Sequence, residues 1–232
     1  SGFKEIFIPE ENAAEGKLVT GIDVYTHSNL RQLIEHLQGK IKLQPLPKEN
    51  ILQNLDRAYD VDFADVKGQP VARRALEIAA AGGHSILMMG APGCGKTMLA
   101  RRLVTILPPV TEAEALEITK IYSIVNMLPE TESVMIERPF RSPHHSVSAS
   151  ALLGGGTYPM PGEVTLSHNG VLFLDELPEF ERYTLEMLRQ PLEDGEVHIS
   201  RVRGTMNYPA RFLLIAAGNP CPCGYLGDKF RR

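Results

Sequence analysis

Short hydrophobic runs alternate along this chain with stretches in which hydrophobic residues recur at helical spacing. The runs at 86–89, 170–174 and 211–217 have the length and composition of buried β-strands. Helical spacing is found at 98–107 and 179–192; the residues on one face are Leu99, Leu103, Val104 and Leu107 in the first stretch and Leu185, Leu188 and Leu192 in the second. The pattern predicts strands and helices that follow one another from about residue 86 onward.

Residues with strong end preferences mark two more helices. Pro70 lies in the first turn of a predicted helix, and Gly82-Gly83 follows its last turn. Thr111 and Glu114 have the spacing of a capping box, which predicts a helix from there to about Ile124.

The first 43 residues form a small unit of their own in this pattern. Strands are predicted at 5–8 and 22–25, and helices at 10–16 and from Ser28 or Asn29 to Gly39. Two strands and two helices are too few for an independent core, so we expect part of a truncated domain or a unit that docks on the next one. Residues 44–61 have the composition of a linker with one or two helical turns, and the main domain begins at Asp62.

The strongest chemical signal is a glycine-rich loop between a predicted strand and a predicted helix. It fits the phosphate-loop pattern G-x-x-x-x-G-K-[ST] at every fixed position. Glycines let the backbone N–H groups approach phosphate oxygens, and the start of the following helix adds its positive dipole end. The residues predicted to bind a nucleoside triphosphate are Gly90, Ala91, Pro92, Gly93, Cys94, Gly95, Lys96, Thr97 and Met98. Lys96 is predicted to reach the β- and γ-phosphates, and the Thr97 hydroxyl to ligate Mg²⁺.

Two acidic residues and one amide follow the other predicted strands. Asp175 and Glu176 end the run at 170–174, at the carboxyl edge where α/β sheets bind ligands. Asp175 is predicted to hold Mg²⁺, and Glu176 to act as general base toward the attacking water. Asn219 follows the strand at 211–217, a position from which an amide can orient that water.

Two segments interrupt the alternation of strands and helices. The glycine-rich stretch at 154–162 favours a loop or hairpin tip. The runs at 196–200 and 205–208 predict a hairpin with Arg201 and Arg203 at its tip. Because arginine forks bind phosphate, both are candidate contacts to a nucleic-acid backbone. A solvated tip, or a salt bridge between subunits, fits these residues equally well.

Histidines and cysteines give weak metal signals. No cysteine or carboxylate lies at ligand spacing near His144, His145 or His168, so polar contacts are favoured over metal binding. Cys221 and Cys223 form a lone C-x-C, which is half of a tetrahedral zinc site. Within this chain we expect two free thiols there, and zinc only if a further cysteine pair follows.

Composition sets the outer bounds. The 232 residues are 43% hydrophobic and 22% charged, which is ordinary for a globular protein. A net charge of −4 argues against a wholly basic nucleic-acid-coating protein and leaves room for a local basic patch. No apolar run approaches the roughly 18 residues of a membrane span. Three cysteines without a disulfide framework are typical of the cytoplasm.

Several strings resemble one family. Beside the phosphate loop, the strings RPFRSPHH at 138–145, LDELPEF at 174–180 and LRQPLEDG at 188–195 resemble the magnesium-chelatase-like AAA+ ATPases. The NPCPCG string at 219–224 and the start of the chain are similar to the ComM/YifB family within that group. The strings GFKEIFIP, NAAE and IDVY resemble the tail of a Lon-protease-like (ribosomal S5 domain 2-like) domain, in which no Lon-type serine–lysine pair can be placed.

The resemblance implies a fold and a function. It implies an α/β P-loop NTPase with a five-stranded parallel αβα sheet and two hairpin insertions at 154–162 and 196–208, preceded at 1–43 by the Lon-like tail. In AAA+ proteins a segment like Val66, Gly68 and Gln69 lies against adenine, although simple entry into a helix also explains it. Asn219 corresponds to sensor 1. The arginine finger and the lid with sensor 2 would lie beyond these residues, so weak hydrolysis is expected.

The implied activity is that of an ATP-driven, hexameric motor that moves DNA junctions in recombination and natural transformation, with ATP and Mg²⁺ as cofactors and no membrane partner. Two other classes remain open. One is a chelatase-type ATPase subunit that remodels a protein partner without nucleic acid. The other is a nucleotide-gated scaffold that does not hydrolyse, which the presence of Lys96, Asp175, Glu176 and Asn219 argues against.

Overall fold

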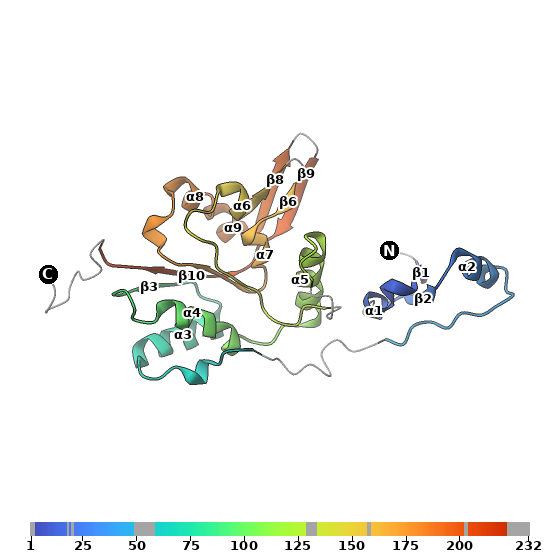
Figure 1. Ribbon diagram of the computed structural model, residues 1–232, viewed down its shortest axis with the longest axis horizontal. Coiled ribbons are helices and arrows are strands. Elements are labelled where there is room, and N and C mark those ends of the chain that lie inside the picture. Colours follow the sequence, from blue (N-terminus) through green and yellow to red (C-terminus); the bar gives the residue numbers. More distant parts are fainter. Residues whose placement is uncertain are drawn as a thin grey trace. The chain divides into compact units, whose positions relative to one another are not determined.

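A computed structural model describes residues 3–17, 19, 21–48, 59–128, 134–156, 159–201 and 204–221 (Figure 1). The chain divides into two compact units, one within residues 1–56 together with 128–134 and the other within residues 57–127 and 135–232. We describe each unit by itself. The helical turns predicted at 51–58 lie outside the described residues.

The first unit contains the predicted strands and helices. Strands β1 (Glu5–Pro9) and β2 (Asp23–His27) pair in parallel, with a 3₁₀ turn η1 (Glu10–Asn12) and helix α1 (Ala13–Gly16) between them. Helix α2 (Leu30–Leu37) follows, and the Asn29 side chain caps it by accepting a hydrogen bond from the Gln32 N–H at 3.0 Å. The predicted order of elements is confirmed.

This unit buries little hydrophobic surface. Val24 on β2 is buried, but Leu30, Ile34 and Leu37 of α2 are 67%, 44% and 66% exposed. The hydrophobic face that defines α2 in the sequence is therefore largely open to solvent, as expected for a unit with too few elements for a core of its own.

The second unit is built on a four-stranded parallel sheet in the order β3-β10-β7-β4. The strands are β3 (Ile86–Met89), β4 (Phe140–Arg141), β7 (Val171–Leu174) and β10 (Leu213–Gly218). Strand β10 lies between β3 and β7, with Ile215 opposite Ile86 on one side and Phe173 on the other. The last predicted strand, β10, therefore lies between β3, which precedes the glycine-rich loop, and β7, which precedes Asp175 and Glu176.

Strand β3 differs from the prediction. It was expected to be buried, but its residues alternate, with Leu87 57% and Met89 54% exposed. The physical reason is its position at the edge of the sheet, where β10 is its single neighbour among the described strands. A five-stranded parallel sheet was expected, and the parallel sheet has four strands among the described residues.

Two layers of helices cover this sheet. Helices α3 (Pro70–Gly82) and α4 (Lys96–Leu103), with the turns η2 (Phe63–Asp65) and η3 (Val104–Ile106), lie on one face (Figure 1). Leu76, Leu99 and Leu103 pack there against Val171 and Phe173 of β7. The alternate residues of β7, Leu172 and Leu174, belong to the core on the other face. The α/β fold is confirmed, because one buried strand contributes to hydrophobic cores on both of its faces.

The second face carries short helices and both hairpins. They are α6 (Ala149–Leu153), α7 (Glu163–Leu166), hairpin β5 (Gly154–Gly155) with β6 (Met160–Pro161), and hairpin β8 (Glu196–Arg201) with β9 (Gly204–Pro209). Helix α5 (Glu112–Ile124) has Thr111 as its N-cap, and Thr111 and Glu114 form the predicted capping box. The hairpins predicted at 154–162 and 196–208 are both present.

The single helix predicted at 179–192 is wrong. The segment folds as a 3₁₀ turn η4 (Leu177–Glu179) and two short helices, α8 (Arg182–Glu186) and α9 (Arg189–Asp194). Pro191 lies inside α9, and its ring would clash with the carbonyl of Met187 if one helix ran through. The break between α8 and α9 falls at Met187 and Leu188, where this clash predicts it.

Candidate functional site

The glycine-rich loop joins the end of β3 to the start of α4. Gly93 and Gly95 have φ angles of +75° and +89°, which favour glycine. Gly95 is also the N-cap of α4, so the unpaired N–H groups of the first helical turn open beside the loop. These two glycines, of which Gly95 is a fixed position of the phosphate-loop pattern, therefore shape a loop suited to bind an anion.

Lys96 links the loop to the central strand of the sheet. Its Nζ donates to the carbonyl oxygens of Gly90 and Ala91 at 2.8 and 3.1 Å and to Asn219 Oδ1 at 3.1 Å. Asn219 directly follows β10, so residues 123 positions apart meet through one ammonium group. This ammonium is held at the mouth of the loop, where phosphate oxygens would offer it stronger, charged acceptors.

A second pair of side chains bridges α4 and β7. Thr97 Oγ1 donates to Asp175 Oδ2 at 2.6 Å, and the other oxygen of Asp175 accepts the Glu176 N–H at 2.9 Å. A hydroxyl and a carboxylate are oxygen ligands of the kind that Mg²⁺ prefers. Among the described residues no cluster of three or more histidine, cysteine or acidic side chains could hold a metal ion.

These groups line one cavity of about 390 Å³. Its lining residues are Pro92, Gly93, Gly95, Lys96, Thr97, Met98, Asp175, Glu176, Gly218 and Asn219. The structure thus brings together the phosphate loop, both acidic residues and the amide that the sequence predicts as a site. Gly90 lies behind the loop, where its N–H donates to the Gly218 carbonyl at 3.3 Å.

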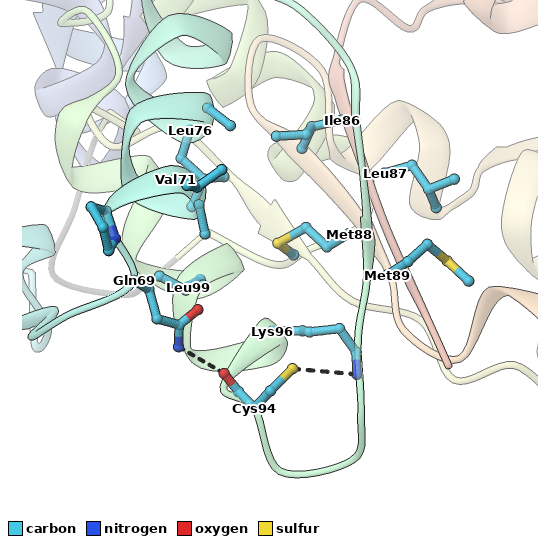
Figure 2. A pocket seen from close by; sticks show the side chains of 13 residues that line it. Gln69, Val71, Leu76, Ile86, Leu87, Met88, Met89, Cys94, Lys96 and Leu99 are labelled. Atoms are coloured by element: carbon cyan, nitrogen blue, oxygen red, sulfur yellow. Dashed lines mark hydrogen bonds between the residues drawn. The ribbon is translucent and has the colours of Figure 1, made fainter. Parts of the chain in front are cut away.

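An adjacent cavity of about 470 Å³ opens between α3 and the exposed edge of β3 (Figure 2). Its walls are mostly apolar and include Val71 and Met88. Gln69 lies at its rim, where Nε2 donates to the Cys94 carbonyl at 2.8 Å. Of the three residues predicted to lie against the base, Gln69 alone is among the residues that line this cavity. Val66 is 1% exposed and packs in the core, and Gly68 supplies a turn with φ of +74°.

The sequence did not reveal a partner for Glu176. His145 Nδ1 lies 3.1 Å from Glu176 Oε2. The sequence favoured ordinary polar contacts for His145, because no cysteine or carboxylate lies at metal-ligand spacing nearby, but nothing in it pointed to a residue 31 positions later. The pairing arises because the loop after β4 and the turn after β7 follow neighbouring parallel strands.

Two predictions fall partly or wholly outside the described residues. The β8–β9 hairpin is present, but Arg203 and the Arg201 side chain are not described. The C-x-C prediction is corrected at Cys221, which is disulfide-bonded and not a free thiol; Cys223 is not described. Cys94 is free and exposed.

No described helix is long and apolar enough to cross a membrane.

The fold and the cavity define an α/β P-loop protein of the AAA+ class. The sequence profile of the family described as magnesium chelatase, subunit ChlI, matches residues 62–232. The chain therefore belongs to the magnesium-chelatase family. A chain in the structure of the complex between subunits BchI and BchD of magnesium chelatase has the same fold, with a TM-score of 0.50 and 26% identity over 65% of this chain and 52% of that one.

Curated relatives confirm the resemblance to the ComM/YifB group. YifB of Salmonella typhimurium is 49% identical over 230 residues, 99% of this chain and 44% of YifB. The competence protein ComM of Haemophilus influenzae is 48% identical over 232 residues, 99% of this chain and 45% of ComM. The magnesium-chelatase 38 kDa subunit of Rhodobacter capsulatus is 26% identical over 176 residues, 68% of this chain and 50% of that subunit. The chain spans less than half the length of YifB and ComM.

Proposed function

We propose that this chain is the ATP-binding and ATP-hydrolysing core of an AAA+ motor. The observation that supports this most directly is the meeting of Lys96 and Thr97, from the start of α4, with Asp175 and Asn219, from the ends of β7 and β10, at one cavity. Each of these side chains offers a group that a nucleoside triphosphate with Mg²⁺ requires.

Each residue has a distinct role in this proposal. Lys96 exchanges its carbonyl acceptors for phosphate oxygens, and the N–H groups at the start of α4 bind the same anion. Thr97 and Asp175 hold Mg²⁺, which when bound neutralises charge on the phosphates. Glu176 accepts the proton of the attacking water, and Asn219 orients that water.

The apolar cavity beside the phosphate loop is our candidate for the base of the nucleotide. It adjoins the phosphate cavity, since Lys96 lines both. Gln69 offers an amide at its rim, and apolar walls suit the flat face of a purine.

Two substitutions in the full-length protein test the proposal. Lys96→Met should abolish ATP binding, because the cavity loses its phosphate-binding ammonium. Glu176→Gln should bind ATP with near-normal affinity and lose turnover by roughly 10²–10⁴-fold, the usual contribution of a general base. Unsubstituted protein that binds no ATP, or a Glu176→Gln variant with normal turnover, would contradict it.

We further propose that the motor acts on DNA as a hexameric ring that moves branched junctions. Support comes from the similarity to a relative named for competence and from the two arginines at the β8–β9 hairpin tip. The alternative is a chelatase-type subunit that remodels a protein partner, which the weaker similarity to a magnesium-chelatase subunit favours.

DNA-stimulated ATP turnover separates these two functions. We expect branched DNA to stimulate the full-length protein, and the double change Arg201→Ala and Arg203→Ala to remove the stimulation. Arg182→Ala, which alters an arginine 92% exposed on α8, is a matched control that should keep it. A healthy basal rate that DNA does not change would favour the remodelling subunit.

A further inference from the structure

The two hairpins on the second face of the sheet lie side by side (Figure 1). The shorter hairpin, β5–β6, pairs only Gly154 with Pro161 and Gly155 with Met160. A two-stranded ribbon of this length has little stability of its own in water, so neighbouring elements must hold it in place. The longer hairpin, β8–β9, pairs six residues of each strand and carries the two arginines of the proposed DNA contact at its tip.

Gly154 allows the two hairpins to approach closely. Its φ is +111°, and a Cβ at this position would lie 2.6 Å from Ile199 Cδ1 on β8 and would also clash with the carbonyl oxygen of Met160. A larger residue would therefore have to displace backbone as well as a side chain. Because Gly154 has no side chain, β5 packs directly on β8, where Ile199 is buried.

Tyr208 joins the hairpins by a hydrogen bond. It lies on β9 opposite Val197 of β8, is 5% exposed, and donates from Oη to the carbonyl oxygen of Pro159 at 2.7 Å. Pro159 directly precedes β6, so the bond links the longer hairpin to the shorter one. Burial raises the pKa of the Tyr208 hydroxyl, which therefore stays protonated and able to donate at neutral pH.

We propose that Tyr208 is a positioning residue that makes the two hairpins one DNA-contacting unit. Its hydroxyl holds the start of β6 against β9, so the shorter hairpin keeps a defined place beside the arginine tip while DNA is bound. The inference rests on the proposed action on DNA. Tyr208 and Pro159 are both outside the set of described residues that line the phosphate cavity and its apolar neighbour, so loss of the bond should spare basal ATP turnover and reduce the response to DNA.

Hydrogen exchange of the backbone amides tests the hydrogen bond without DNA. Tyr208→Phe removes only the hydroxyl and leaves the ring in the core that it shares with Ile199. In the full-length variant we expect the amides of 154–162 to exchange roughly 2–10-fold faster, because the shorter hairpin loses one anchor. The β8–β9 ladder should keep its protection, since its own backbone pairing is unchanged.

ATP turnover with and without branched DNA measures the functional consequence. Tyr208→Phe should keep basal kcat within about two-fold and need roughly 3–10-fold more DNA for half-maximal stimulation. Tyr183→Phe is the matched control, because it removes the same hydroxyl from a tyrosine that is 62% exposed on α8. This control should change neither the exchange at 154–162 nor the response to DNA.

The outcomes distinguish this inference from the function on which it rests. If DNA does not stimulate the unsubstituted protein, the proposed action on DNA is wrong, and the role of Tyr208 in it is wrong as well. If DNA does stimulate it, a normal DNA response in Tyr208→Phe overturns the positioning role alone. Unchanged exchange at 154–162 would overturn it too, because the hydroxyl would then not hold the hairpin. Equal losses of basal and DNA-stimulated turnover would assign Tyr208 to the fold as a whole and also overturn it.

Discussion

Thr97 and Asp175 lie 78 positions apart in the sequence and are joined by a hydrogen bond of 2.6 Å. The contact exists because the first turn of α4 and the end of β7 meet at the same edge of the sheet. Both groups of this pair, the hydroxyl and the carboxylate, are ligands for a hard cation. In the function we propose, this pair is the position at which Mg²⁺ would join the nucleotide to the sheet.

We predict that Mg²⁺ strengthens ATP binding only when both Thr97 and Asp175 are present to bind it. Asp175→Asn and Thr97→Val should each weaken Mg²⁺-ATP binding roughly 10–100-fold, which corresponds to one charge-assisted contact of about 1.5–3 kcal/mol. Binding of ATP in the presence of a chelator should change far less. Titration calorimetry with and without Mg²⁺ measures the difference.

Thr97→Ser is the matched control for this experiment, because it keeps the hydroxyl and removes only a methyl group. Its Mg²⁺-ATP affinity should stay close to that of the unsubstituted protein. Equal weakening of ATP binding with and without Mg²⁺ in Asp175→Asn would show that the carboxylate does not act through the metal.

Asn219 should affect turnover more than binding. Lys96 keeps its two carbonyl acceptors, on Gly90 and Ala91, when the amide is removed. We therefore expect Asn219→Ala to bind ATP within a few-fold of normal affinity and to lose roughly 10²–10³-fold in turnover, as for other residues that orient the reacting groups. Single-turnover hydrolysis measured at saturating ATP gives this rate directly. A large loss of affinity would instead assign Asn219 to binding.

The site could be predicted closely because its signals are local. The phosphate loop is recognised from glycines and one lysine within eight positions. The strand before the two acidic residues is recognised from its run of apolar residues. The sheet topology of an α/β protein then places the ends of such strands at one edge. That is why Lys96, Asp175 and Asn219 could be assigned to one cavity from residues scattered over more than half of the chain.

What could not be predicted depends on neighbours in space. The sequence of β3 is uniformly apolar, so only the sheet order shows that Leu87 and Met89 lie exposed at an edge. The contact of His145 with Glu176 joins two loops whose spacing carries no pattern. The break in the helix predicted at 179–192 could have been predicted, because Pro191 is a local signal in the sequence. The prediction followed the helical spacing of the leucines and not this proline.

A carboxylate outside the site, Glu117, should make stability depend on pH, because its pKa is lowered in the folded protein. His168 is 2% exposed; its Nδ1 accepts the Arg211 N–H at 3.1 Å, so Nε2 carries the proton that Glu117 Oε2 accepts at 3.0 Å. This hydrogen bond lowers the pKa of Glu117 below its ordinary value, with a smaller contribution from the Asn169 amide. The folded state therefore favours the charged carboxylate.

The sign of the pH effect follows from that shift. A carboxyl group whose pKa is lowered on folding adds stability above its unfolded pKa, about 4.3 for glutamate, and this stability is lost as pH falls through the folded value. Glu117→Gln should be less stable than the unsubstituted protein at pH 7, and the gap should narrow below about pH 4. Urea unfolding at several pH values tests this. The gap should be small, because the Glu117 side chain is 54% exposed, and a constant gap would contradict the linkage.

The last prediction concerns the ion pair that ties the edge strand β4 to α7. Arg141 donates from Nε and Nη2 to the two oxygens of Glu163 at 2.7 and 2.8 Å, and both side chains are only about a quarter exposed, at 24% and 23%. Lysine cannot reproduce this two-point contact, so Arg141→Lys should cost about 1–3 kcal/mol. For a protein of this size that corresponds to a fall in melting temperature of roughly 2–12 °C.

The chain offers a matched control for this substitution. Arg182 pairs with Glu186 at 2.9 Å, but the two side chains are 92% and 62% exposed on α8. Solvent screens such a pair, so Arg182→Lys should change the melting temperature by about 2 °C or less. The double-mutant cycle of Arg141→Lys with Glu163→Gln should show coupling, because either change breaks the same pair of hydrogen bonds. Equal, small effects at both arginines would mean that β4 is held by its backbone pairing with β7 alone.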